Sequence, residues 1–536
     1  MKNLSLSILL IFSLLQLYSQ NAGDILKKFP APNKYCTGLT YDGKYLWTVD
    51  RRADSIYALN LNGKIIKSMP APGYFCMGMT YDGKYLWISD KDFITTNYEI
   101  YSGKIYKINP KTGKILKILF TPGDSPMDLA WDGKYLWIAD ASDKKIYCLD
   151  TADATIITSF PSPWVSPTGM TWDGKYLWIA DNTSNKIYRV DPSTGRVIMI
   201  INAPGEYPWG MTWLNNTLIS TDYQNDSIYF QNIFTDKPYR RMHKIKEKID
   251  FTSDIINYGP GTLNILNQYI AIPKSLPNQD IEKIKFNPQP NDIAKDKWGQ
   301  KIAIFSTKNV PPNTRVIKTM TVYASIYEVY YNIYPEQVGT KKDIPKQIKE
   351  KYLQDEDKYK INSPIIQSAV KEAIGNEQNL YWIARDIFDY VREKLHYERS
   401  GGWDIAPTVL RRGSGSCSEY SFVYIAMCRA AGIPARFAGS VVMRAERSNY
   451  DYVFHRWVEI YLPPYGWIPV DPSGGDRKYP AAQAEFFGHL YPHYLITTQG
   501  AGNSEFLGWD YNSSIKINAN NKVSLRTETI ADWDIQ

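Results

Sequence analysis

The sequence has few residues of the kinds that hold metal ions. Its 536 residues include only five cysteines and five histidines. These occur in neither a Cys-x-x-Cys nor a His-Glu-x-x-His spacing, the patterns typical of structural and catalytic zinc sites. We therefore expect neither a metal ion nor another cofactor. Five is also an odd number of cysteines, so at least one thiol stays unpaired within the chain.

The sequence also lacks a strong excess of one charge and, beyond its N-terminus, long apolar runs. The 62 basic and 55 acidic residues give a net charge of +7. They are interspersed, without the basic stripe of nucleic-acid-binding proteins, so we expect no nucleic-acid partner. No later segment approaches the ~20 apolar residues of a membrane helix. We expect no membrane span in the mature chain.

Residues 1–20 have the pattern of a secretory signal peptide. Met1-Lys-Asn3 is a basic start, and Leu4–Tyr18 is a short apolar segment interrupted by serines. Small or polar residues follow, and we expect cleavage between Ser19 and Asn21. The short, interrupted apolar run disfavours a permanent membrane anchor. The mature chain is then exported, to the periplasm, the cell surface or the extracellular medium.

Aromatic residues are abundant, and many recur at fixed positions of a repeat. In its clearest copy the repeat reads Tyr-Asp-Gly-Lys-Tyr-Leu-Trp, and copies begin at Tyr41, Tyr81, Trp131, Trp172 and, in decayed form, Trp213. A repeat of ~40 residues with four short alternating segments and an Asp-Gly turn is typical of a propeller blade. We predict an all-β propeller of about five blades over residues 21–245. The segment at Ile25 is expected to complete the last blade.

These repeats resemble the broad NHL/YVTN-like group of β-propellers, and the blade number is similar to that of propeller-type glutaminyl cyclases. The resemblance assigns no active-site residue. We interpret the repeated Trp, Tyr and Asp as packing and turn residues, and we expect the propeller to bind protein or glycan. Cys36 and Cys76 occupy the same position of adjacent repeats. They either form a disulfide or, as the spacing of neighbouring blades favours, stay as two buried thiols.

Two further regions follow the repeats. Strand-like segments at 265–273, 301–305 and 320–329 predict a β-sandwich-like domain over residues 246–340. Over residues 341–500, a helix cap before Pro364 and apolar residues at helical spacing over 380–395 predict an α+β domain. Residues 501–536 are expected to form short terminal strands.

The α+β region contains a candidate nucleophile, Cys417. It follows a Gly/Ser run and opens an apolar segment to Ala431 that stops at Gly432-Ile-Pro434. This pattern predicts a loop, then a buried helix, then a glycine cap and a proline stop. A thiol at a helix N-terminus lies at the positive end of the helix dipole, which favours the thiolate.

His455 and Asp471 lie at the two ends of a predicted β-hairpin. His455 begins an alternating segment, Pro463–Gly466 turns the chain, and the return segment ends at Asp471. Both side chains therefore lie toward the same open end. The imidazole is placed to accept the thiol proton, and the carboxylate is placed to hold the other ring nitrogen. Each residue alone is usually structural, but the three together favour a catalytic Cys417, His455 and Asp471.

Two tryptophans are weaker candidates. Trp403 lies between the helix predicted over 380–395 and Cys417, and Trp457 follows His455 by two residues. Both are considered as residues that line the cleft or support an oxyanion site. The alternative is a packing role.

Residues 362–473 resemble the transglutaminase-like (papain-related) core. The family's usual motifs are G-x-C, R-A-x-G-I-P-A-R, H-x-W-V-E-V and G-W-x-x-x-D-P. The matching segments, in order, are Arg412–Cys417, Cys428–Arg436, His455–Tyr461 and Gly466–Pro472. The resemblance implies Cys417 as nucleophile, His455 as general base and acid, and Asp471 as its orienting partner. Arg456 departs from the pattern, because the family often has a small residue there.

The family includes cross-linkers, proteases, amidases and inactive binders, so the fold alone does not determine the reaction. The expected fold is multidomain: a propeller, a β-sandwich-like domain and an α+β papain-like transglutaminase core. The expected function is acyl transfer through a cysteine thioester on protein or peptide amides, with hydrolysis favoured over cross-linking. A non-catalytic adhesion or scaffold protein that keeps the core as a binding fold is the alternative from another class.

Overall fold

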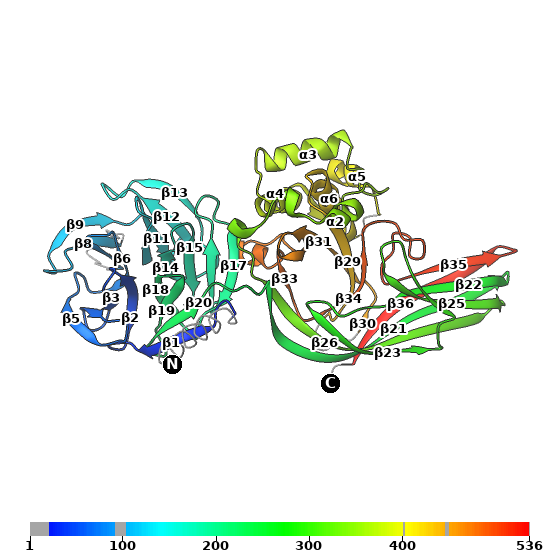
Figure 1. Cartoon of the computed structure of the whole chain (residues 1–536), viewed down its shortest axis with the longest axis horizontal. Helices are drawn as coiled ribbons and strands as arrows, with labels where there is room; N and C mark the ends of the chain where they lie inside the picture. Colours follow the sequence, from blue (N-terminus) through cyan, green and yellow to red (C-terminus); the bar gives the residue numbers. More distant parts are fainter. Residues whose placement is uncertain (1–20, 92–102, 400–402, 445–449, 535–536) are drawn as a thin grey trace, which may run out of the picture. The chain divides into compact units, whose positions relative to one another are not determined.

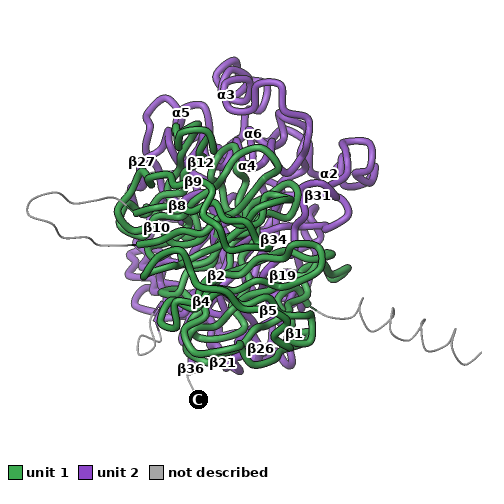
Figure 2. The backbone as a smooth tube through the Cα atoms, turned by 90° about the vertical axis from the view of Figure 1, so that its left-hand side faces the viewer, with its two compact units in different colours: residues 1–238, 477–484 green, residues 239–476, 485–536 purple. Residues whose placement is uncertain are grey.

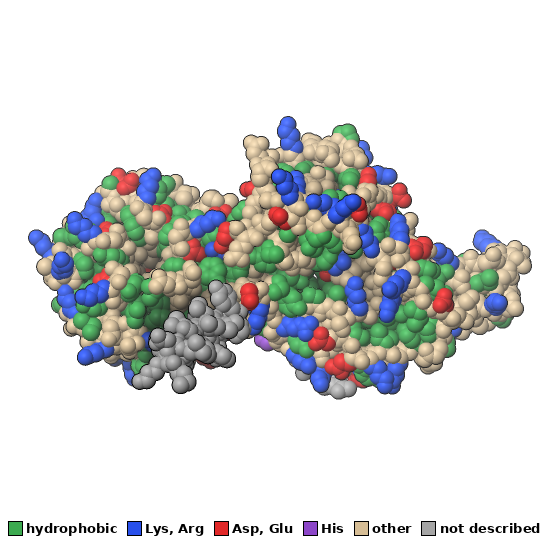
Figure 3. All heavy atoms as spheres, in the orientation of Figure 1, with side chains coloured by type: hydrophobic (Ala, Val, Ile, Leu, Met, Phe, Trp, Pro, Cys, Tyr) green, Lys and Arg blue, Asp and Glu red, His purple; other side chains and the backbone are tan. Residues whose placement is uncertain are grey.

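The computed structural model describes residues 21–91, 103–399, 403–444 and 450–534 (Figure 1). The predicted signal peptide lies outside these residues. The chain forms two compact units (Figure 2): unit 1 is Met1–Pro238 with Arg477–Ala484, and unit 2 is Tyr239–Asp476 with Glu485–Gln536. On the faces drawn in Figure 3, basic and acidic side chains are interspersed over both units. Within the described ranges, no helix has the length and apolar character needed to cross a membrane.

Unit 1 is built from five four-stranded antiparallel sheets, one for each copy of the repeat. Four of them are, in chain order, β2 (Cys36–Tyr41), β3 (Leu46–Asp50), β4 (Ser55–Leu59) and β5 (Ile65–Pro70); β6 (Cys76–Tyr81), β7 (Leu86–Asp90), β8 (Lys104–Ile108) and β9 (Ile115–Phe120); β10 (Pro126–Trp131), β11 (Leu136–Asp140), β12 (Lys145–Leu149) and β13 (Ile156–Pro161); β14 (Pro167–Trp172), β15 (Leu177–Asp181), β16 (Lys186–Val190) and β17 (Val197–Asn202). The fifth consists of β18 (Pro208–Leu214), β19 (Thr217–Asp222), β20 (Ser227–Asn232) and β1 (Ile25–Pro30). Because β1 pairs with β20, the prediction that the segment at Ile25 completes the last sheet is confirmed.

The repeated motif forms the same turn in each of the first four sheets. Asp42 accepts hydrogen bonds from the backbone N–H groups of Lys44 (2.8 Å) and Tyr45 (2.6 Å) and from the indole N–H of Trp47 (2.7 Å). The same three contacts are made by Asp82, Asp132 and Asp173. Each Asp precedes a glycine with positive φ, which glycine adopts without steric cost. The repeated Asp and Trp therefore have the structural roles expected of them.

A buried carboxylate joins the sheets of unit 1. Their first strands contact one another in the cyclic order β2, β6, β10, β14, β18 and back to β2. Asp128 on β10 accepts N–H groups from four of these strands. Its Oδ1 bonds to Met79 and Leu129 (both 2.9 Å), and its Oδ2 bonds to Met170 (2.8 Å) and Met211 (3.1 Å). Burial raises the pKa of Asp128 to about 8, although the four N–H groups act in the opposite direction.

All five cysteines are free thiols. Cys36 and Cys76 are buried, and their Sγ atoms lie 3.4 Å from the carbonyl oxygen of Asn33 and 3.5 Å from that of Gly73. Of the two alternatives for this pair, the structure thus has two buried thiols that are not joined in a disulfide.

Unit 2 contains two sheets whose inner faces form one core. The first sheet consists of β23 (Gln279–Asn287), β26 (Thr314–Tyr331), β21 (Tyr239–Pro260), β36 (Val523–Asp534), β30 (Tyr450–Asp451) and β33 (His489–Leu490); the second consists of β24 (Asp292–Lys295), β25 (Lys301–Val310), β22 (Leu263–Ala271) and β35 (Ser513–Ala519). Buried residues from both, among them Phe251, Phe305 and Trp533, pack together. The boundary expected at residue 245 lies inside β21, and β35 and β36 pair with β22 and β21.

The rest of unit 2 places helices against a third sheet of order β32-β31-β29-β34 (Figure 1). Its strands are β29 (Ala435–Val442), β31 (His455–Leu462), β32 (Gly466–Val470) and β34 (Tyr494–Gly500), and β27 (His396–Tyr397) pairs with β28 (Ser414–Gly415) beside it. The helices are η1 (Pro335–Gln337), η2 (Lys341–Asp343), α2 (Lys346–Tyr352), α3 (Pro364–Ile374), α4 (Leu380–Lys394), α5 (Ala406–Arg412) and α6 (Cys417–Ala430), whereas α7 (Pro480–Ala484) belongs to unit 1. The buried helix α6 contacts α3, α4, α5, β29 and β31.

Candidate active site

Cys417 is the first residue of α6, as its sequence context predicts. The start of the helix is fixed by Glu419, which is fully buried and accepts the backbone N–H of Ser416 (2.9 Å). Its second oxygen pairs with Arg412 (2.8 Å), which also pairs with Asp404 (2.6 Å). Acidic groups in the first turn complement the helix dipole. The ion pair between the exposed Arg412 and the buried Glu419 therefore holds the thiol at a defined helix terminus.

His455 and Asp471 are brought together by the predicted hairpin. His455 begins β31, Asp471 directly follows β32, and these strands pair with Val458 opposite Val470. His455 Nε2 lies 2.7 Å from Asp471 Oδ2. The other oxygen of Asp471 accepts Ser473 N–H (3.0 Å) and Oγ–H (2.7 Å). The carboxylate is thus held against the imidazole by its own turn.

Cys417 completes a line of three groups. Its side chain lies close enough to His455 and to the backbone N–H of Arg456 for both to lower the pKa of the thiol. Because Nε2 is engaged with Asp471, Nδ1 is the ring nitrogen left for the thiol. The structure therefore brings together all three residues predicted from the sequence.

The electrostatics of this line favour a charge-separated pair. Burial opposes ionisation of Cys417, but the hydrogen bond and charge of His455 outweigh it and lower the thiol pKa below its usual value. Burial also opposes the imidazolium, yet Asp471 and Cys417 together raise the pKa of His455 to about 10. A lowered thiol pKa together with a raised imidazole pKa favours the thiolate and imidazolium forms of the pair. Such a pair supplies a ready nucleophile and a proton for a leaving group.

We expect iodoacetamide to alkylate Cys417 at pH 6, where an ordinary thiol of pKa ~8.5 is only ~0.3% thiolate. Burial raises the pKa of both Cys36 and Cys148 to about 12 and also raises that of Cys428, and Cys76 is fully buried, so these four thiols should stay unlabelled. Peptide mass spectrometry should find a single adduct, and His455→Ala should slow its formation at least ~10-fold. Labelling of Cys417 with the pH profile of an ordinary thiol would contradict the ion pair.

The two candidate tryptophans lie on different sides of the site. Trp457 is buried, with its ring centroid 5.8 Å from that of His455 and 5.0 Å from that of Tyr494, so it packs beside the imidazole. Trp403 is half-buried and stacks on Tyr511 at 6.4 Å. Neither makes a hydrogen bond to Cys417 within the described residues. Their packing roles are visible, and a role toward an oxyanion stays a prediction.

A buried arginine and two residues of the C-terminal region were not predicted as parts of the site. Arg456 is fully buried, and its guanidinium lies among the rings of Trp403, Phe422, Phe437 and Tyr511 at 4.3 to 5.3 Å. Its Nη2 donates to the carbonyl oxygen of Trp509 (2.6 Å). Trp509 and Tyr511 precede β35, in a tail that carries no chemical motif in the sequence. Only the departure of Arg456 from the family pattern indicated unusual charge here.

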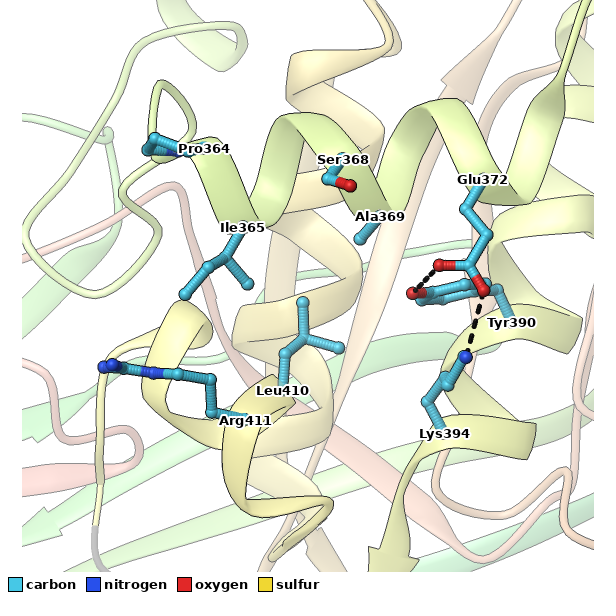
Figure 4. Close-up of a pocket in the computed structure, with 9 residues that line it drawn as sticks. All are labelled: Pro364, Ile365, Ser368, Ala369, Glu372, Tyr390, Lys394, Leu410 and Arg411. Atoms are coloured by element: carbon cyan, nitrogen blue, oxygen red, sulfur yellow. Dashed lines mark hydrogen bonds and ion pairs between the residues drawn. The ribbon is translucent and has the colours of Figure 1, made fainter.

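A separate hollow of about 440 Å³ lies among α3, α4 and α5 (Figure 4). Its polar end is a closed network in which Glu372 accepts the Tyr390 hydroxyl (2.9 Å) and pairs with Lys394 (3.0 Å). The rest of its lining is largely aliphatic and contains no cysteine or histidine. Elsewhere in the described part of the chain, no group of three His, Cys, Asp or Glu side chains is arranged to hold a metal ion. The candidate active site is therefore the one at Cys417.

Fold and geometry define a protein in which a helix-borne cysteine faces a histidine and a carboxylate on a hairpin. Residues 367–472 match the family model of the transglutaminase-like superfamily, and the chain carries a domain of that superfamily. The uncharacterized protein YebA of Bacillus subtilis (strain 168) is 24% identical over 104 residues. This match spans 18% of the chain and only 14% of YebA.

Solved structures with partial similarity match the chain at low identity. A putative cysteine protease from Cytophaga hutchinsonii has a TM-score of 0.39 and 15% identity, covering 55% of this chain and 100% of its own. The glutaminyl cyclase of Myxococcus xanthus has a TM-score of 0.35 and 13% identity, covering 39% of this chain and 96% of its own. None of these TM-scores is high enough to define the fold.

Proposed function

We propose that this chain is a transglutaminase-like cysteine enzyme that transfers the acyl group of a protein or peptide amide through a thioester on Cys417. The observation that carries the proposal is the line from Cys417 through His455 to Asp471, with a lowered thiol pKa and a 2.7 Å bond from His455 to Asp471. An unreactive binding fold has no need of a thiolate–imidazolium pair.

The reaction starts with transfer of the Cys417 proton to His455. Sγ then attacks the amide carbonyl carbon, a C–S bond forms, and the carbonyl electrons move to the oxygen. The first N–H groups of an α-helix have no partner within the helix, so those at the start of α6 are suited to stabilise this oxyanion. Collapse breaks the C–N bond, and His455 donates its proton to the departing amine. Water, activated by His455, then cleaves the thioester and releases the acid.

Hydrolysis is favoured over cross-linking because nothing in the sequence or in the described residues identifies an amine-acceptor site. The test is incubation with casein, with and without a fluorescent primary amine. A protease or amidase releases peptides or ammonia without labelling casein. A cross-linking transglutaminase attaches the amine, and a non-catalytic scaffold protein does neither.

Unit 1 is proposed to be a five-bladed β-propeller that binds the substrate. Five four-stranded sheets whose first strands contact one another in cyclic order support this architecture. Tethering a binding module to the catalytic domain raises the local concentration of substrate. Residues 1–20 have a basic start, continue with an apolar segment and end with small or polar residues, and this order supports export. The proposed location is periplasmic, cell-surface or extracellular.

Asp471→Asn is expected to lower kcat/KM by roughly 10- to 10³-fold and to leave more activity than loss of the thiol. The substitution removes the negative charge that stabilises the imidazolium. The new amide can also turn an N–H group toward Nε2, where the carboxylate accepted a hydrogen bond. Since Asp471 raises the pKa of His455, the alkaline limb of the pH–rate profile should also move to lower pH. Ser473→Ala, which removes only one bond to the carboxylate, is the matched control and should change kcat/KM less than tenfold. An unchanged pH profile in Asp471→Asn would show that another group holds His455.

A further inference from the structure

Unit 1 has a hollow whose lining departs from the symmetry of the repeat. The hollow has a volume of about 530 Å³ and is lined by four aromatic residues, Tyr35, Tyr74, Phe75 and Tyr223, and by three charged ones, Arg51, Arg52 and Asp54. Volumes of this size are typical of ligand sites. All of the lining residues belong to unit 1.

Equivalent positions can be compared because each sheet makes the same backbone bond beside its first strand. The residue after the second strand donates its N–H to the carbonyl oxygen of the residue before the first strand. The five pairs are Arg51 to Tyr35, Lys91 to Phe75, Ala141 to Ser125, Asn182 to Ser166, and Tyr223 to Tyr207. Two sheets therefore form this bond with small or short polar residues. The aromatic and basic residues of the other three are therefore not needed to form this backbone bond.

The three unusual sheets are neighbours. Their first strands, β18, β2 and β6, contact one another in that order, whereas β10 and β14 belong to the sheets with Ser, Ala and Asn. One contiguous arc of unit 1 thus carries the aromatic and basic side chains. Repeats that differ only by drift have no reason to concentrate them in one arc.

The arc is a preassembled surface. The Tyr223 ring centroid lies 5.3 Å from that of Tyr35 and 6.0 Å from that of Tyr207. The Arg51 guanidinium lies 4.9 Å from the Tyr223 ring centroid and donates to its hydroxyl (2.5 Å). Arg52 is held in the same way by Tyr35, whose ring centroid is 5.1 Å away and whose hydroxyl accepts a bond of 2.9 Å. Side chains fixed in advance lose little entropy when a ligand binds.

The arginines also retain capacity for an anion. A guanidinium has five N–H donors, and within the described residues neither Arg51 nor Arg52 forms an ion pair with a carboxylate. Tyr74 and Phe75 are 73% and 50% exposed beside them, which is unusual for large aromatic side chains. Asp54 adds one negative charge, so the lining keeps an excess of one positive charge.

We propose that this arc binds an acidic peptide segment, with its carboxylates on Arg51 and Arg52 and an apolar side chain against Tyr74 and Phe75. Tyrosine and arginine are the residues that dominate protein-recognition sites, and planar guanidinium groups pair bidentately with carboxylates. The choice of a peptide rests on the proposed action on protein amides. An acidic glycan is the competing ligand.

The test is fluorescence polarisation with the full chain carrying Cys417→Ala, so that binding is measured without turnover and independently of the catalytic proposal. The probe is a labelled peptide of Glu-Phe-Ser repeated four times, and its Gln-Phe-Ser counterpart lacks the charge. The acidic peptide should bind at least ~10-fold more tightly than the neutral one. Arg51→Gln with Arg52→Gln should remove most of this difference. Lys84→Gln with Lys134→Gln, which changes the same charge on exposed turns, should not.

A second variant guards against misfolding. Tyr74→Ala removes an exposed ring. It should therefore weaken binding of the acidic peptide roughly three- to tenfold without changing thermal unfolding. If the arginine double variant and the lysine double variant weaken binding of the acidic peptide equally, the proposal is wrong, because the peptide would then be attracted by any positive charge on the surface. Tighter binding of polygalacturonate than of the acidic peptide, again lost with the arginine pair, would overturn the peptide assignment in favour of a glycan.

Discussion

Cys417→Ala should lower acyl-transfer activity by at least ~10⁴-fold, because no other group in the line can form the thioester. His455→Ala should have a similar effect, since it removes both the base for the thiol and the acid for the leaving amine. The two losses should not add, because the residues act as a unit. The measurement is the initial rate of peptide or ammonia release from casein. Unfolding should change little, because the ion pair between Arg412 and the buried carboxylate of Glu419 still defines the start of α6.

Cys428→Ala is the matched control for the loss of the thiol. It removes the same atom from the same helix, but Cys428 is completely buried, away from the site. This variant should keep its activity and lose roughly 1 kcal/mol of stability through the cavity. Full activity in Cys417→Ala would refute the mechanism. Loss of activity in both variants, with altered unfolding, would indicate damage to α6 instead.

The parts of the fold that the sequence predicts best are those encoded locally. The Asp-Gly-Lys-Tyr-Leu-Trp motif is read correctly because its bonds are local: Asp42 accepts the Lys44 N–H and the Trp47 indole N–H, and Gly43 supplies the positive φ of the turn. The start of α6 and the hairpin of His455 are likewise set by neighbouring residues, through Glu419 and the turn at 463–466. Three site residues on two local elements could therefore be placed without knowledge of the whole fold.

The parts that the sequence does not reveal depend on contacts between distant segments. β36 lies at the C-terminal end of the chain yet pairs with β21, and no local pattern specifies that partner. Arg456 is buried partly by the distant residues Trp509 and Tyr511, which return to contact it. The difference between equivalent positions such as Tyr35 and Ser125 is visible in the sequence. The structure adds two observations that the sequence does not contain. The backbone bonds show that the positions are equivalent, and the strand contacts show that the unusual sheets are adjacent.

Asp128→Asn should destabilise unit 1 by about 3 kcal/mol or more, the largest effect expected from any single change in the repeats. The carboxyl group of Asp128 accepts four backbone N–H groups, two on each oxygen. An asparagine replaces one oxygen with an NH₂ group, so two buried N–H groups lose their acceptor and face another donor. Each such group costs ~1–3 kcal/mol. Asp124→Asn, an exposed change of the same charge in the preceding turn, should stay within ~0.5 kcal/mol of the parent.

Hydrogen exchange locates this effect and tests its dependence on pH. Peptides from β6, β10, β14 and β18 should exchange at least ~30-fold faster in Asp128→Asn, while peptides from β22 and β25 in unit 2 serve as internal references. Because burial raises the pKa of Asp128 from 3.8 to about 8, the folded state holds a proton that the unfolded state releases between these values. The contribution of this group is thus full below pH ~4 and declines as the pH rises to about 8. After correction for intrinsic exchange, protection of unit 1 should fall over that interval in the parent and less so in the variant. A parent and variant with identical protection would show that Asp128 does not hold the four strands together.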